Sequence, residues 1–178
     1  MVMKTKLLLI AIILFSTSSF ISNRPVTVFM IGDSTMANRS FQNKNNKERG
    51  WGMMLAGCLT DRVIVDNHAA SGRSTKSFIN EKRWERVLDR IQPGDYVFIQ
   101  LGTNDSWFEA EGLISGLSRE YFNYLMGQMV NAIREKGAPA VIVTPPERLS
   151  AATDEKLGDG TYKVNSYLYG YPDDLRDF

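Results

Sequence analysis

A regular alternation of short apolar runs with longer amphipathic stretches constrains the fold of this chain more than any other feature. The apolar runs have the length of buried strands, and the stretches between them have the spacing of helices that cover a sheet. The expected strands are residues 26–31, 62–66, 96–101 and 140–143. This order is typical of a parallel sheet with helices on its faces. The sequence therefore predicts an α/β protein, a three-layer α/β/α sandwich with a flavodoxin-like parallel sheet.

The amphipathic stretches predict the helices of this sandwich. Residues 52–59 and 74–91 are helix candidates, and residues 119–136 form the clearest helix, with apolar side chains at the three-to-four spacing of a core-facing stripe. Four strands are fewer than the usual five or six, and the pattern weakens after Arg148. We therefore expect a domain that is truncated at its C-terminus, without its last strand and helix.

The first 22 residues have the order of a secretory signal peptide. Lys4 and Lys6 precede an apolar run over residues 7–15, which gives way to small polar residues. We expect residues 1–22 to be removed and residues 23–178 to form one domain that is secreted or periplasmic. An uncleaved membrane anchor extending to Ile21 is the alternative, although the apolar run is short for a bilayer.

Charge and cysteine content exclude several classes of function. Lys and Arg number 21 against 20 Asp and Glu, with no basic stripe, so a nucleic-acid partner is not expected. Cys58 is the only cysteine, which rules out an internal disulfide, and its apolar surroundings predict a buried free thiol. No cluster of metal ligands is visible and no cofactor is implied. After signal cleavage, stable membrane insertion is not expected.

Small polar residues follow three of the predicted strands, in residues 32–35, 67–74 and 102–105. The carboxyl ends of parallel strands meet at one edge of a sheet, so these clusters are expected to build one site. Gly32 permits a tight turn that exposes the Ser34 hydroxyl. The N–H groups of Ser34 and Gly72 and the side-chain amide of Asn104 are candidate donors to an oxyanion, each worth about 3 kcal/mol in the transition state. A hydroxyl with convergent donors indicates acyl transfer.

These clusters resemble the sequence blocks of the GDSL-like or SGNH hydrolases. Gly32-Asp33-Ser34 is similar to the first block, Gly72 to the second, and the run from Gly102 to Asp105 to the third. The resemblance implies that Ser34 is the catalytic nucleophile and that Gly72 and Asn104 complete the oxyanion hole. It covers roughly residues 26–176.

Within that family, three segments look most similar to rhamnogalacturonan acetylesterases. They are residues 49–52, Asn67 together with residues 72–74, and residues 144–148. The resemblance implies a secreted carboxylic-ester hydrolase that removes acetyl groups from a pectin-type polysaccharide or oligosaccharide. A lipase or thioesterase of the same superfamily is an alternative. Nucleotide binding is not supported, because the first loop lacks the glycine and lysine pattern of a phosphate loop.

In those relatives, an Asp-x-x-His segment near the C-terminus supplies the general base and the acid that orients it. This sequence contains no such segment, and its single histidine, His68, lies just before Gly72, where the family has no catalytic role. A structural role is expected for His68 rather than proton abstraction from Ser34. The chain is therefore interpreted either as a fragment or as a truncation with impaired activity, and a carbohydrate-binding remnant of the fold is an alternative function.

Residues beside the predicted nucleophile and donors have less specific interpretations. Asp33 and Asp105 are expected to stabilise their loops through hydrogen bonds to backbone N–H groups. Arg73 either binds the carboxylate of a galacturonate or stabilises its own loop. Trp107 is a candidate for stacking on a sugar ring, whereas Trp51 is expected to belong to the core.

Overall fold

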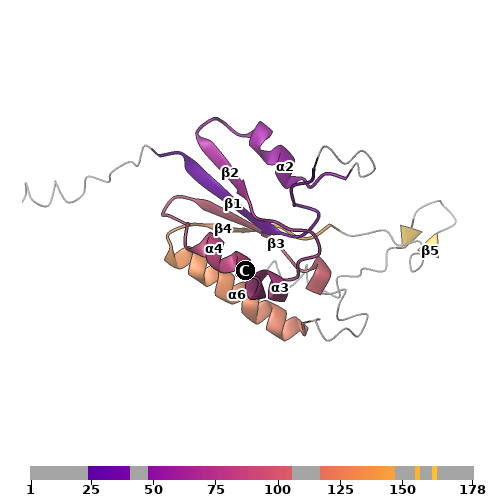
Figure 1. The fold of residues 1–178 in the computed structure, drawn as a ribbon. Coiled ribbons are helices and arrows are strands. Elements are labelled where there is room, and N and C mark those ends of the chain that lie inside the picture. The colour runs from indigo at the N-terminus through magenta and orange to yellow at the C-terminus, as the bar shows by residue number, and fades with distance from the viewer. Residues whose placement is uncertain (1–23, 41–47, 106–116, 147–154, 157–161, 164–178) are drawn as a thin grey trace, which may run out of the picture.

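The computed structural model describes residues 24–40, 48–105, 117–146, 155–156 and 162–163, and its main body is a three-layer α/β/α sandwich (Figure 1). The sheet has the strand order β2-β1-β3-β4, and its pairs are parallel. Its strands are β1 (Val26–Gly32), β2 (Val63–Asn67), β3 (Tyr96–Gln100) and β4 (Ala140–Ile142). The predicted fold class and all four strands are confirmed, with ends shifted by one residue.

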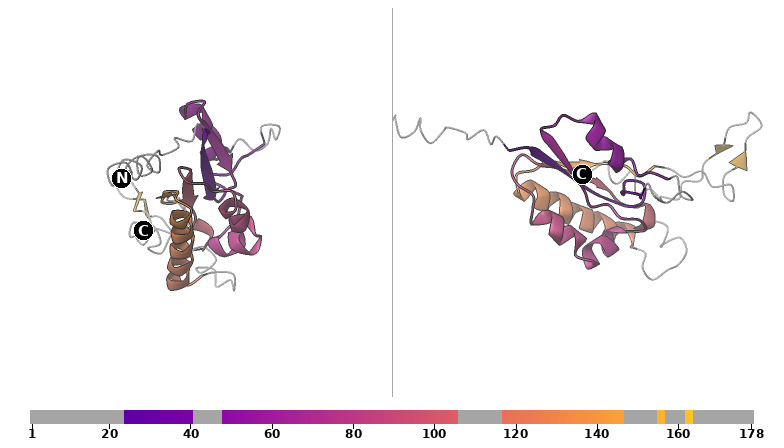
Figure 2. Two further views of the ribbon diagram at one scale, coloured as in Figure 1. Left: turned by 90° about the vertical axis from the view of Figure 1, so that its left-hand side faces the viewer. Right: turned by 45° about the horizontal axis from the view of Figure 1, so that its top comes forward.

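Helices lie on both faces of this sheet (Figures 1 and 2). One face is covered by α2 (Gly52–Leu55) and the short 3-10 helix η1 (Ala56–Cys58). The other carries α3 (Thr75–Asn80), α4 (Arg83–Leu88) and α6 (Arg119–Glu135). Because consecutive side chains of a strand point to opposite faces, β1 contributes to two separate cores. Phe29 and Ile31 pack beneath α6, whereas Val28 and Met30 pack with Met36 and Trp51.

The long helix predicted over residues 74–91 is two helices in the structure. Lys82 separates α3 from α4 with a left-handed backbone, φ 56°, which ends one helix and starts the next in a new direction. The apolar spacing of the two helices is continuous enough to conceal this break.

The prediction of a buried Cys58 is wrong. The predicted helix over residues 52–59 becomes the 3-10 helix η1 from Ala56, and residues 56–60 are exposed, Cys58 among them. A 3-10 turn has a different period from an α-helix, so the apolar side chains of this segment do not share one face.

Beyond residue 146 the described backbone consists of two short antiparallel strands, β5 (Glu155–Lys156) and β6 (Tyr162–Lys163). The predicted signal peptide, residues 1–22, and Trp107 lie outside the described residues. Among the described residues, the structure contains no helix that is both long and apolar enough to cross a bilayer.

Candidate active site

Three loops leave the carboxyl-terminal edge of the sheet and are joined to one another by hydrogen bonds. The first loop (residues 33–37) follows β1, the second (residues 68–74) follows β2, and the third (residues 102–105) follows β3. The Ala70 N–H of the second loop donates at 3.0 Å to the carbonyl of Gly32, the last residue of β1, from which the first loop leaves, and Asn104 Nδ2 of the third loop donates to the Arg73 carbonyl of the second at 3.1 Å. The predicted meeting of the three clusters at one edge is thus what the structure shows.

Ser34 lies in a single tight turn directly after β1. The Ala37 N–H donates to the Asp33 carbonyl at 3.0 Å, which closes the turn. Asp33 is buried, and its Oδ1 accepts from the N–H and the hydroxyl of Thr35 at 2.9 and 2.8 Å. Asp33 therefore stabilises the turn, as predicted, while Ser34 stays partly exposed.

Close packing explains the glycine at position 32. A Cβ there would lie 2.9 Å from Met36 Sδ and 3.0 Å from the Gln100 carbonyl. From the α2 side, the Trp51 N–H donates to the Thr35 carbonyl at 2.9 Å and its indole N–H to Gln100 Oε1 at 2.6 Å. Trp51 is expected in the core, and in the structure it is partly buried and packs against the core cluster of β1 and Met36 while it holds the first loop. Sequence reasoning missed Gln100, although a polar residue inside an apolar strand is a signal of such a contact.

Asn67 connects the first loop to the second. Its Nδ2 donates to the Met36 carbonyl at 2.9 Å and to Asn38 Oδ1 at 3.0 Å, while its Oδ1 accepts from the Ala69 N–H at 3.0 Å. One amide side chain therefore sets the distance between the loop of Ser34 and the loop of Gly72.

Gly72 has a left-handed backbone, φ 73°, and it is exposed, with no atom within 4 Å of the position that a Cβ would take. Its conformation, rather than lack of space, favours glycine there. Asn104 uses one N–H of its amide for the Arg73 carbonyl, and the amide carries a second N–H. These two residues thus lie on adjoining loops that a direct hydrogen bond connects.

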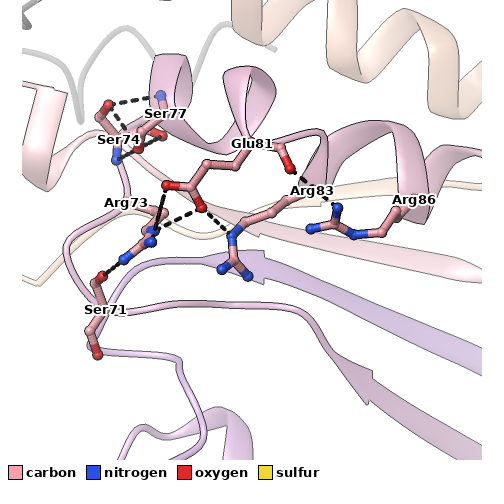
Figure 3. Close-up of polar contacts among 7 residues, drawn as sticks. All are labelled: Ser71, Arg73, Ser74, Ser77, Glu81, Arg83 and Arg86. Carbon is pink, nitrogen blue, oxygen red and sulfur yellow. Dashed lines mark hydrogen bonds and ion pairs between the residues drawn. The ribbon is translucent and has the colours of Figure 1, made fainter.

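The contacts of Arg73 support loop stabilisation rather than substrate binding. Its guanidinium group is occupied by the Glu81 carboxylate and the Ser71 carbonyl (Figure 3). Nothing in the sequence pattern indicated Glu81 as its partner.

Asp105 is fully buried and binds the start of α3. Its carboxylate accepts from the Thr75 N–H at 2.9 Å and from the Thr75 hydroxyl at 3.1 Å. Burial raises the pKa of Asp105 to about 6, and the hydrogen bonds from Thr75 oppose this rise. The predicted role of Asp105 in holding backbone N–H groups is confirmed.

His68 belongs to a polar cluster on the face of the sheet that carries α4. Its Nε2 lies 3.1 Å from Asp66 Oδ1 and 3.3 Å from Arg90 Nη1, and its ring lies beside Phe29. These contacts give His68 the structural role that the sequence predicted. Within the described ranges, no group of three His, Cys, Asp or Glu side chains is placed to hold a metal ion.

The sequence matches a known protein family and is similar to known proteins of Bacillus subtilis. The model of the GDSL-like Lipase/Acylhydrolase family matches residues 30–174, a range that includes all three loops. The probable rhamnogalacturonan acetylesterase YesY of Bacillus subtilis is 35% identical over 132 residues, which are 74% of this chain and 59% of YesY. The rhamnogalacturonan acetylesterase RhgT of the same organism is 31% identical over 155 residues, 86% of this chain and 60% of RhgT. The chain thus spans about three fifths of the length of these relatives.

The crystal structure of the B. subtilis protein YxiM has the same fold. It superimposes with a TM-score of 0.67 at 30% sequence identity, covering 86% of this chain and 41% of YxiM.

Proposed function

The chain belongs to the GDSL-like lipase/acylhydrolase family, and from this premise we propose that it is a secreted serine carboxylic-ester hydrolase that removes acetyl groups from a pectin-type polysaccharide. The observation that carries the proposal is the junction of the three loops. Hydrogen bonds from Ala70 to Gly32 and from Asn104 to Arg73 connect the segments that hold Ser34, Gly72 and Asn104. The polysaccharide is proposed from YesY and RhgT, whose names state rhamnogalacturonan acetylesterase.

In the proposed reaction, Ser34 Oγ attacks the acetyl carbonyl and forms a bond to its carbon while a general base takes the hydroxyl proton. The carbonyl oxygen becomes negatively charged and accepts hydrogen bonds from the N–H groups of Ser34 and Gly72 and from Asn104 Nδ2. The bond to the sugar oxygen then breaks, that oxygen takes a proton, and water releases acetate from Ser34. His68 is not assigned as the base, because its Nε2 faces Asp66 and Arg90.

The test is covalent labelling of the purified chain with p-nitrophenyl acetate. We expect the peptide that contains Ser34 to gain the mass of one acetyl group, and the Ser34→Ala variant to release nitrophenol at the background rate. His68→Ala is the matched control and is expected to keep the labelling rate. Equal nitrophenol release by the unmodified chain and by Ser34→Ala would refute a serine nucleophile.

A second experiment tests the proposed substrate. Acetate release is measured from acetylated rhamnogalacturonan and from acetylated xylan, and faster release from the rhamnogalacturonan is expected.

A carbohydrate-binding function without turnover is the second candidate, and the position of His68 favours it. His68 Nε2 lies 3.1 Å from Asp66 Oδ1 and 3.3 Å from Arg90 Nη1, so this ring nitrogen is engaged by a carboxylate and a guanidinium group. Retention on immobilised acetylated rhamnogalacturonan, equal for the unmodified chain and for Ser34→Ala and without acetate release, would select this function over hydrolysis.

A further inference from the structure

The guanidinium group of Arg73 lies between Ser71 and Glu81 (Figure 3). Its Nε is 3.1 Å from both oxygens of Glu81, and its Nη2 is 3.0 Å from Glu81 Oε1. Its Nη1 donates to the Ser71 carbonyl at 2.8 Å. One planar group with a fixed arrangement of donors therefore connects the carboxylate to the backbone of the second loop.

The Ser71 carbonyl and the Gly72 N–H belong to the same planar peptide unit. In a trans peptide these two groups point in opposite directions, and the plane rotates only as a whole. No cis peptide occurs among the described residues. When Arg73 Nη1 fixes the direction of the Ser71 carbonyl, it therefore also fixes the direction of the Gly72 N–H, which faces away from the guanidinium group.

Gly72 itself places little restraint on this plane. It is exposed and no neighbouring atom would contact a Cβ at this position. Glycine also has wider access to backbone conformations than any other residue. The Arg73 N–H donates to the Ala70 carbonyl at 3.3 Å and closes a turn around the Ser71–Gly72 peptide, but this closure is compatible with either direction of the central peptide. A further contact is therefore needed to fix the direction of the Gly72 N–H.

The backbone of Glu81 is held in place at the end of α3, so its carboxylate can hold Arg73. It is the C-cap of α3, and its N–H donates to the Ser77 carbonyl at 3.0 Å. The start of α3 is held in turn by the Ser74 and Ser77 capping box. Hydrogen bonds from Arg83 and Arg73 keep the pKa of Glu81 below its ordinary value of 4.5, so the carboxylate stays charged at neutral pH.

Arg73 also contacts the second predicted donor. Its backbone carbonyl accepts from Asn104 Nδ2 at 3.1 Å, which orients the amide of that side chain. The side chain of Arg73 thus acts on the Gly72 peptide, while its backbone acts on Asn104.

We infer that Glu81 is a positioning residue, which holds the Arg73 guanidinium group against the Ser71 carbonyl and so aims the Gly72 N–H at the reacting carbonyl oxygen. The inference rests on the proposed function of Gly72 as an oxyanion donor. It assigns Arg73 to the orientation of the oxyanion hole and not to binding of a substrate carboxylate.

The direct test uses nuclear magnetic resonance to follow the environment of the Ser71–Gly72 peptide group. The sequence contains only two Ser-Gly pairs, Ser71-Gly72 and Ser115-Gly116. Protein made by cell-free synthesis with carbonyl-labelled serine and ¹⁵N-labelled glycine therefore gives two signals in a spectrum that correlates each amide with the preceding carbonyl. We expect Arg73→Lys and Glu81→Gln each to shift one of these signals and leave the other unchanged.

Arg83→Gln is the matched control. Arg83 Nε contacts Glu81 Oε2 at 2.7 Å, but the hydrogen bond to the Ser71 carbonyl comes from Arg73. The control is expected to leave both signals in place. Unmoved signals in Arg73→Lys and Glu81→Gln, or an equal shift in Arg83→Gln, would refute the positioning role.

Kinetics supply the second readout. The rate of Ser34 acetylation at saturating p-nitrophenyl acetate is expected to fall roughly tenfold or more in Glu81→Gln, because loss of an oxyanion donor costs about 10²–10³ in this quantity. KM is expected to stay unchanged, as is the melting temperature. A rise in KM with an unchanged maximal rate would overturn the inference. Absence of Ser34 acetylation in the unmodified chain would instead refute the proposed function, which separates the two failures.

Discussion

The buried carboxylate of Asp105 holds the first residue of α3, Thr75, by its backbone N–H and by its hydroxyl, across 30 positions of the sequence. This contact connects the third loop to the helix that follows the second loop. Asp105 directly follows Asn104, so the same short turn carries the predicted oxyanion donor and its anchor. The carboxylate is retained in a buried site, where burial raises its pKa to about 6.

This raised pKa predicts a specific dependence of stability on pH. In the unfolded chain the carboxyl has its ordinary pKa of 3.8, so between about pH 4 and pH 6 the folded state binds more protons than the unfolded state. The contribution of Asp105 to the free energy of unfolding is therefore most favourable below pH 4 and is lost as the pH rises to about 6. Two pKa units correspond to an upper bound of roughly 3 kcal/mol.

Urea unfolding at a series of pH values checks this prediction. Other carboxyl groups titrate over the same range, so the informative quantity is the difference between the unmodified chain and Asp105→Asn. That difference is expected to change between pH 4 and pH 6 and to be constant above pH 7. A pH-independent difference would show that Asp105 titrates normally.

A comparison of Gly72→Ala with Gly94→Ala distinguishes a loss of stability caused by backbone strain from a loss of catalytic rate. Both glycines are left-handed, with φ of 73° and 87°, and at both an added Cβ would meet no atom within 4 Å. Each substitution should cost about 1–2 kcal/mol of unfolding free energy. Gly94 lies in the turn before β3, at the other edge of the sheet. Only Gly72→Ala is therefore expected to slow Ser34 acetylation, roughly tenfold or more. Equal kinetic effects of the two variants would contradict the oxyanion role of Gly72.

A second pair of glycines tests the junction of the first and second loops. A Cβ at Gly52 would lie 2.5 Å from the Met36 carbonyl and 2.6 Å from Asn67 Nδ2, two groups that are hydrogen-bonded to each other. Gly52→Ala should separate them and destabilise the protein by roughly 1–3 kcal/mol. Gly57→Ala, which places its Cβ in open space, should be neutral or stabilise by less than about 1 kcal/mol. The melting temperatures of Gly52→Ala and Gly57→Ala test this prediction, and equal values would contradict close packing around Gly52.

The sequence predicts the strands of the sheet and the meeting of the three loops, because both follow from physical rules. Apolar runs of strand length, separated by helical stretches, specify a parallel sheet, and parallel strands carry their following loops to one edge. Chain order and strand direction place the loops of Ser34, Gly72 and Asn104 at one edge, and these loops are joined in the structure. The chemistry of the three residues and their resemblance to the family blocks single them out within the loops.

Contacts between side chains distant in sequence were not predictable by the same rules. The pair of Arg73 and Glu81 depends on the break at Lys82, where a left-handed residue ends α3. The exposure of Cys58 depends on a change from α-helix to 3-10 helix that the apolar composition conceals. Both depend on the local backbone, which binary apolar patterning does not encode.

At the opposite edge of the sheet, Asp95 is expected to contribute to stability alone. Its Oδ1 accepts from the Thr27 N–H at 2.9 Å and from Arg24 Nη1 at 2.6 Å, and its Oδ2 accepts from the Gln92 N–H at 2.9 Å. The Asp95 side chain is 2% exposed, whereas that of Arg24 is 29% exposed. Asp95→Ala leaves two backbone N–H groups and the guanidinium group without this acceptor, so we expect a loss of about 3–5 kcal/mol. Arg24→Ala should cost roughly 1–2 kcal/mol, because the carboxylate keeps both backbone donors and water reaches the vacated position.

Urea unfolding followed by tryptophan fluorescence measures the loss of unfolding free energy in Asp95→Ala and in Arg24→Ala, and Ser34 acetylation per folded molecule should be unchanged in each. Equal losses of stability would mean that the ion pair, rather than the backbone hydrogen bonds, is the main contribution of Asp95.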